Sequence, residues 1–155
     1  MRVFLEEARE ELKRADHIIY VSLKYTRTVD VIKNLVERLI SAIDFTIDRL
    51  LDHAVEQKLI AERPTNAGLK ASAMKKAFGE QFAEMVALYI HLRKVSRAEY
   101  KKSSEYRRHV TMTATTDDGV FMIDIDKSKE LYLKVKQFVE DSEKFINGGE
   151  AEEER

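Results

Sequence analysis

The stretch VDVIKNLVERLISAIDFTIDRLLDHAVEQKLI, residues 29–60, contains the longest uninterrupted apolar pattern of the chain. Its apolar residues recur at three- and four-residue steps, which predicts one long α-helix. Thr28 can cap this helix, because its hydroxyl can accept a hydrogen bond from a free backbone N–H group. The apolar positions are too many for a single helix face. We therefore expect this helix to lie at the centre of a bundle or to be shared with a second subunit.

Helical patterns continue on both sides of this stretch. Apolar residues at helical spacing predict a first helix over residues 3–25 and a third over residues 69–95. The segment AERPTNAG, residues 61–68, separates the second helix from the third, because proline, asparagine and glycine favour a loop. A last helix is expected over residues 127–146, with Asp126 as its N-terminal cap.

The period of the apolar residues changes between the third and the last helix. RHVTMTA and VFMIDI are β-rich runs on either side of Asp118-Gly119, a step that suits a hairpin turn. Ser96 can cap a short further helix before this hairpin. The sequence therefore predicts a mainly α protein, an antiparallel up-and-down helical bundle of four to five helices with a small β-hairpin near residues 108–125.

The composition limits the class of protein. The chain has 155 residues, of which 44% are hydrophobic and 35% are charged, and its net charge is −1. This length predicts one domain over residues 1–147, followed by an acidic tail over residues 148–155. A high charged fraction without cysteine is typical of thermophile proteins, and the lack of cysteine is also typical of cytoplasmic ones. No apolar run approaches the roughly 18 residues that a membrane span requires, so we expect no membrane partner.

One segment concentrates positive charge in this nearly neutral chain. HLRKVSRAEYKKSSEYRRHV, residues 91–110, holds seven lysines and arginines against two glutamates. Arg93, Arg97 and Lys101 would lie along one side of a helix, where they could bind phosphate groups. The residues that we predict to bind nucleic acid or phosphate are Arg93, Lys94, Arg97, Lys101, Lys102, Arg107, Arg108 and His109.

The two tyrosines of the basic segment allow two interpretations. Tyr100 and Tyr106 could stack on bases, which favours nucleic-acid binding. Alternatively, both rings pack inward and the charges are simply solvated, which is the more common cause of a charge run. Among the four histidines, His109 adjoins Arg107 and Arg108 and is the one to consider as a general base, although a structural or exposed histidine is more common.

Three aspartates on the predicted long helix form an acidic line. Asp44, Asp48 and Asp52 are four residues apart and therefore share one face, where they repel one another. Basic side chains such as Arg49, or a cation, should compensate them. A Mg²⁺ or Mn²⁺ site is the weaker hypothesis, and a polar outer or subunit-facing stripe is the stronger one. The five glycines form no phosphate-binding loop, so no cofactor is expected.

Three segments of the chain resemble the HEPN family of small prokaryotic helical domains. They are FLEEAREELKRADHII at residues 4–19, LRKVSRAEY at residues 92–100 and KELYLKVKQFVEDSEKFI at residues 129–146. The resemblance implies an up-and-down bundle, a homodimer, a nucleotidyltransferase partner and, in many members, RNA cleavage. Cleavage in that family depends on an arginine that is followed by four to six residues and a histidine. None of the four histidines of this chain has an arginine at that spacing.

These observations predict a non-catalytic accessory or regulatory module. It would bind RNA, DNA or nucleotide phosphates through the basic segment, by charge-assisted hydrogen bonds and counterion release. One alternative is a homodimeric protein-interaction module that does not bind nucleic acid. The other is an enzyme, either a divergent HEPN-type RNase or a metal hydrolase that uses the three aspartates.

Overall fold

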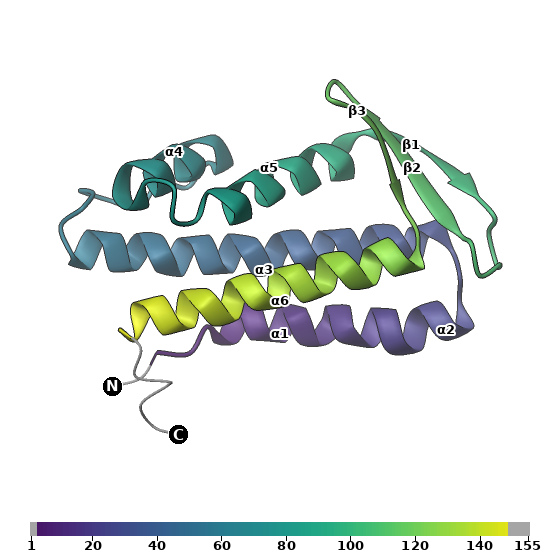
Figure 1. Ribbon diagram of the computed structural model, residues 1–155, viewed down its shortest axis with the longest axis horizontal. Coiled ribbons are helices and arrows are strands. Elements are labelled where there is room, and N and C mark those ends of the chain that lie inside the picture. The colour runs from purple at the N-terminus through teal and green to yellow at the C-terminus, as the bar shows by residue number, and fades with distance from the viewer. Residues whose placement is uncertain (1–2, 149–155) are drawn as a thin grey trace.

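Four long helices run in alternating directions through the computed structural model, which describes residues 3–148 (Figure 1). They are α1 (Glu6–His17), α3 (Val29–Glu56), α5 (Ala83–Arg97) and α6 (Ile125–Ile146). Two further helices are α2 (Leu23–Tyr25), a single turn at the end of the first helical segment, and α4 (Ala67–Phe78), which lies beside α5. The prediction of an antiparallel helical bundle with a small β element is confirmed.

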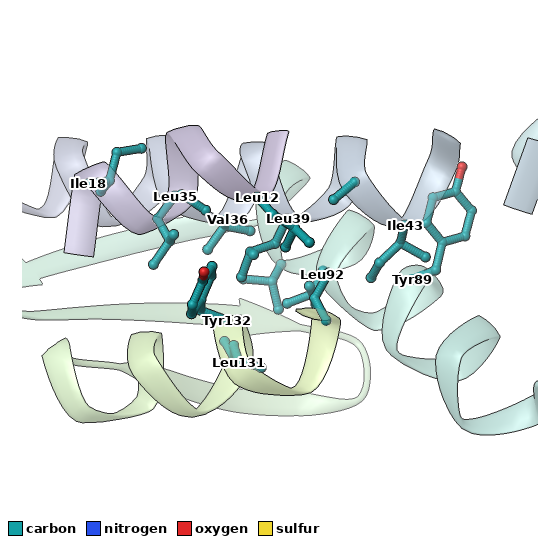
Figure 2. Packing of buried hydrophobic residues seen from close by; sticks show 14 of the residues in the cluster. Leu12, Ile18, Leu35, Val36, Leu39, Ile43, Tyr89, Leu92, Leu131 and Tyr132 are labelled. Atoms are coloured by element: carbon teal, nitrogen blue, oxygen red, sulfur yellow. The ribbon is translucent and has the colours of Figure 1, made fainter. Parts of the chain in front are cut away.

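Helix α3 is the central element of the bundle, as its wide apolar set predicts. It packs against α1, α4, α5 and α6, and none of its large apolar side chains is exposed. Figure 2 shows Leu35, Leu39 and Ile43 of α3 among side chains from the neighbouring helices. The Thr28 hydroxyl accepts a hydrogen bond from the Val31 N–H group at 3.4 Å, which confirms the predicted cap. Four helices of the same chain therefore account for the apolar width of α3, and a second subunit is not needed to cover it.

The first helical segment contains a π turn. Residues Ile18–Ser22 form the π-helix η1 between α1 and α2, and the Leu23 N–H group bonds to the Ile18 carbonyl five residues earlier. The helical run from Glu6 to Tyr25 agrees with the predicted first helix. The π turn lets both Ile18 and Ile19 face the core, while Tyr20 is half exposed. Such turns are frequent at functional sites in helices.

The predicted third helix, over residues 69–95, is wrong, because α4 ends at Phe78 and α5 begins only at Ala83. Gly79 has a φ of +63°, which ends α4, and its N–H group donates to the Lys75 carbonyl at 2.8 Å. Glycine adopts this backbone conformation without a steric cost. The rings of Phe78, Phe82 and Phe145 meet edge to face with centroids 5.2–5.4 Å apart, so this turn is held against α6.

The predicted hairpin is present as two strands, and a third strand extends it to a three-stranded antiparallel sheet. Its strands are β1 (Glu99–Ser103), β2 (Thr111–Thr116) and β3 (Gly119–Ile123), in that order. The short helix expected after Ser96 is therefore wrong, since β1 occupies most of that segment. Strand β1 aligns Tyr100 with Ala114 of β2, whose side chain is buried against the helices. Pairing with a distant strand overrides the local preference of these residues.

The boundaries of the last helix also differ from the prediction. Asp124, rather than Asp126, is the cap of α6, and its side chain accepts a hydrogen bond from the Lys127 N–H group at 2.8 Å. Of the predicted acidic tail, residues 149–155 lie outside the described residues. Within residues 3–148, no helix combines the length and the hydropathy that a membrane-spanning segment requires.

Candidate phosphate-binding clefts

The fold divides the basic segment between the two ends of the sheet. In an antiparallel sheet, the β1–β2 loop and the β2–β3 turn lie at opposite ends. Lys94 of α5 pairs with Asp118 in the β2–β3 turn, whereas Arg107 and Arg108 belong to the β1–β2 loop. Lys101 lies in β1, so it does not share a helix side with the arginines of α5. Of the predicted residues, Arg93, Lys94 and Arg97 line one cleft and Arg108 and His109 line another, and the two clefts share no residue. Lys101, Lys102 and Arg107 line neither of them.

Two of the predicted lysines are already paired with carboxylates. Lys94 lies 2.8 Å from Asp118, and Lys102 lies 3.0 Å from Asp30. The hydrogen bond to Asp118 raises the pKa of Lys94, and the hydrogen bond to Asp30 raises the pKa of Lys102. The positive charges of Lys94 and Lys102 are therefore neutralised by aspartates of the same chain.

The first cleft lies between the β1–β2 loop and the starts of α2 and α6, and we name it the loop cleft. It has a volume of about 590 Å³. Its charged and aromatic lining residues are Tyr20, Lys24, Arg27, Arg108, His109 and Lys129, with Asp124 and Asp126 as the acidic members. None of its four lysines and arginines forms an ion pair within residues 3–148. The buried Nε atom of Arg27 has no hydrogen-bond acceptor in that range. The loop cleft therefore carries four unpaired cations against two carboxylates.

The β1–β2 loop beside this cleft has a strained backbone. Ser104 has a φ of 54° and Tyr106 a φ of 64°, which is uncommon for residues other than glycine. The loop is anchored by the Tyr106 N–H group, which donates to the Arg27 carbonyl at 2.6 Å. Glu105 accepts a hydrogen bond from the Val29 N–H group at 3.0 Å and so ties the loop to the start of α3. The Tyr106 side chain is left 77% exposed by this arrangement.

The two tyrosines of the basic segment differ in their exposure to solvent. Tyr100 packs inward, with the Lys33 ammonium 5.0 Å from its ring centre, whereas Tyr106 points outward. Two further tyrosines, Tyr20 and Tyr25, are 50% and 78% exposed, and sequence reasoning missed both. The signal was present in YVSLKYTR, residues 20–27, where these tyrosines alternate with a lysine and an arginine.

The second cleft lies between α4 and α5, and we name it the arginine cleft. It has a volume of about 670 Å³. Its charged and aromatic lining residues are Asp44, Lys70, Tyr89, Arg93, Lys94 and Arg97. The Arg93 guanidinium lies 5.6 Å from the ring centre of Tyr89. Within residues 3–148, neither Arg93 nor Arg97 forms an ion pair. These two arginines are therefore the cations of this cleft that are free for a ligand.

A buried polar network forms the floor of the arginine cleft. The Tyr89 hydroxyl donates to Asp44 Oδ1 at 2.7 Å, and the Lys70 ammonium donates to the same oxygen at 3.1 Å. Lys70 Nζ also lies 2.8 Å from Asp48 Oδ1, which forms an ion pair but has no directed hydrogen bond. Burial lowers the pKa of Lys70, but attraction to Asp48 and Asp44 outweighs it, and the pKa lies above its ordinary value. Burial, reinforced by the bond to Asp44, raises the pKa of Tyr89.

The two titratable donors of this network hold their protons at neutral pH. At neutral pH Lys70 stays protonated and Tyr89 stays un-ionised, so neither can act as a nucleophile or a general base. Lys70 was not among the predicted site residues. Its carboxylate partners Asp44 and Asp48 are 26 and 22 residues earlier in the chain, so only the fold reveals the contact.

Basic side chains compensate the acidic line on α3. Lys70 pairs with Asp44 and Asp48, and Arg63 lies 3.0 Å from Asp52. Arg49, which the sequence suggested for this role, pairs with Glu7 instead. Within the described part of the chain, no three histidine, cysteine, aspartate or glutamate side chains are placed to hold a metal ion.

Three comparisons with known proteins give no relative of the chain: no family model matches it, and neither a curated protein nor a solved structure does. The resemblance to HEPN domains therefore stays a prediction. A functional argument must start from the two clefts and from the side chains that line them.

Proposed function

We propose that the protein is a non-catalytic module that binds single-stranded nucleic acid through the loop cleft. The observation that carries this proposal is the combination of exposed tyrosines with unpaired cations at one end of the bundle. Tyr20 lines the cleft together with Arg27 and Arg108, and it is half exposed. Tyr25 and Tyr106, which are more than three-quarters exposed, each lie two residues from one of these arginines in the chain. Stacking requires bases that are not paired in a duplex, which favours a single strand over a double helix.

Two physical effects would contribute to the affinity. Lysine and arginine side chains that contact phosphates release counterions, which makes binding strong at low salt and weak at high salt. Each base that stacks on a tyrosine adds about 1–3 kcal/mol, with little preference for sequence. The loop cleft offers both kinds of contact, because Lys24, Arg108 and Lys129 line it together with Tyr20.

Fluorescence anisotropy with a labelled oligouridylate, measured over a range of salt concentrations, tests the proposal. The double variant Arg107→Gln, Arg108→Gln removes one cation of the cleft lining and its exposed neighbour in the same loop, and it should bind more weakly. Its slope of log affinity against log salt should fall by about 0.7 to 1.4, since each lost phosphate contact removes about 0.7. The matched control is Lys75→Gln, Lys76→Gln, which removes two exposed charges from α4 at the other end of the molecule. Undetectable binding at low salt, or equal loss in both double variants, would disprove it.

The same samples test the enzyme alternative. His109 and Arg108 line the loop cleft together, so an RNA strand there would meet a histidine and an arginine. A non-catalytic module leaves the oligonucleotide intact during a long incubation, as judged by gel electrophoresis. If the RNA is cut and His109→Ala abolishes the cutting, a divergent RNase replaces the binding module as the function.

The partner proteins of the module are a separate question. Homodimerisation and association with a nucleotidyltransferase are implied by the resemblance to HEPN domains, and both stay predictions, as does a cytoplasmic location. Sedimentation at micromolar concentration distinguishes a dimer from a monomer. A monomer would remove the protein-interaction alternative without affecting nucleic-acid binding.

A further inference from the structure

An apolar groove continues from the arginine cleft along the seam between α4 and α5. It has a volume of about 350 Å³, and its apolar walls are Ala71, Met74, Phe82, Ala83, Val86 and Ala87. Ile90, which is 41% exposed, lines both the groove and the arginine cleft, so the two hollows meet at this residue. Gly79 lines the far end of the groove, where the chain turns from α4 into α5.

The two hollows differ sharply in chemical character. The arginine cleft presents the guanidinium groups of Arg93 and Arg97, whereas the other cations, Lys70 and Lys94, are paired with aspartates. Guanidinium groups bind carboxylates and phosphates in bidentate fashion, with hydrogen bonds about twice as strong as neutral ones. The groove, in contrast, has a mainly aliphatic and aromatic lining, in which Ser72, Lys75 and Glu80 are the polar members. One continuous site therefore has a cationic end and an apolar end.

We propose that this site binds a single-chain anionic amphiphile, a fatty carboxylate, with its head group at Arg93 and Arg97 and its chain along the groove. The path from Ile90 back to Phe82, the N-cap of α5, covers eight residue steps, which corresponds to about 12 Å. A groove of this length accepts one alkyl chain. A nucleic-acid strand could use the arginines, but it has no apolar chain to place against Val86 and Ala87.

A chain-length series tests the match between the ligand and the groove. Isothermal titration calorimetry with butanoate, hexanoate, octanoate and decanoate should show affinity rising about threefold to fourfold for each methylene that enters the groove. The rise should stop when the groove is full. Acetate, which has the head group alone, and decanol, which has the chain alone, should each bind at least about tenfold more weakly than decanoate. A flat series, or acetate binding as tightly as decanoate, would overturn the proposal.

Variants at the two ends of the site separate its parts. Arg93→Gln with Arg97→Gln should weaken decanoate binding about tenfold or more and leave decanol unchanged. Ala87→Trp, at an exposed position of the groove wall, should fill the groove and remove the dependence on chain length. Circular dichroism checks that both variants are folded. If decanoate binds equally well to the wild type and to both variants, the assignment is wrong.

The variants of the loop cleft make this test independent of the proposed function. Arg107→Gln with Arg108→Gln should leave decanoate binding unchanged, because neither residue lines the arginine cleft or the groove. If the variants of Arg93 and Arg97 lose oligonucleotide affinity and keep decanoate affinity, the arginine cleft belongs to the nucleic-acid surface and the amphiphile site is refuted. Nucleic-acid binding through the loop cleft would survive that outcome.

Discussion

Replacing Lys70 with methionine should lower the free energy of unfolding by roughly 2–3 kcal/mol. The Lys70 side chain is only 9% exposed, and its ammonium group lies within 3.1 Å of Asp44 and 2.8 Å of Asp48. Methionine fills a similar volume but leaves two neighbouring carboxylates without their shared cation. Breaking a fully buried ion pair in this way costs about 3–5 kcal/mol. We expect less here, because the Asp44 side chain is 35% exposed and water can partly solvate it.

Urea unfolding followed by circular dichroism measures this loss. In a chain of this size, the expected change corresponds to a fall in Tm of roughly 5–10 °C. The matched control is Lys75→Met, an exposed lysine in the same helix without an ion pair in the described residues, which should change stability by less than about 0.5 kcal/mol. Adding Asp48→Asn to the Lys70 variant should recover at least half of the loss, because one uncompensated charge is then removed.

The pH dependence supplies a second check on Lys70. Its pKa is higher in the folded protein than its ordinary value of 10.5, so the folded state holds this proton more tightly than the unfolded state. The stability that Lys70 contributes is therefore complete below about pH 10.5 and is lost as the pH rises through the folded pKa. The difference between wild type and variant should shrink in that alkaline range. Equal stability of the Lys70 and Lys75 variants at neutral pH would refute the reasoning about the network.

Two further predictions concern the loop and the sheet. Tyr106→Gly removes an aromatic ring but relieves a positive φ, so the free energy of unfolding in urea should stay equal or rise by up to about 1 kcal/mol. The affinity for the oligonucleotide should fall about fivefold or more, because one stacking surface is lost. A loss of both stability and affinity would contradict this prediction. Burial lowers the pKa of His91, whose ring meets Phe121 at 4.3 Å, so the stability contributed by neutral His91 is present above about pH 6.5 and is lost as the pH falls through the folded pKa. His91→Phe should therefore lose less stability than wild type between about pH 7 and about pH 5, and an identical fall would show that His91 does not titrate in this way.

The parts of the fold that depend on local patterns could be predicted from the sequence. Helix α3 has an apolar period over its whole length and a threonine cap, and both are visible in the residues themselves. The break at Gly79 was missed because Met74 and Met85, on opposite sides of it, are buried in the same core. The apolar stripe therefore continues while the backbone turns. Strand β1 was missed because EYKKS has no apolar alternation of its own, and it becomes a strand by pairing with β2.

The candidate site was predictable only in part for a related reason. A count of charges along residues 91–110 locates the cations but not their partners. Asp30 pairs with Lys102 and Asp118 pairs with Lys94, and both partners come from other elements. Sequence distance also concealed the contribution of Tyr20, which lies more than 80 residues before the loop with which it lines the loop cleft. Each cleft is lined by residues from several distant segments, so the sequence of one segment could identify only some of these residues.

The π turn at Ile18–Ser22 places one extra residue in the helical wall of the loop cleft, to which it contributes Ile19 and Tyr20. A π turn holds one residue more than the α-helical turn it replaces, and each residue rotates a helix by about 100°. The turn absorbs that extra residue locally, so deleting one residue there would restore an α-helical turn and keep Leu23 against the core. The side chains inside the turn would change direction instead, and the Tyr20 ring would leave the wall of the loop cleft.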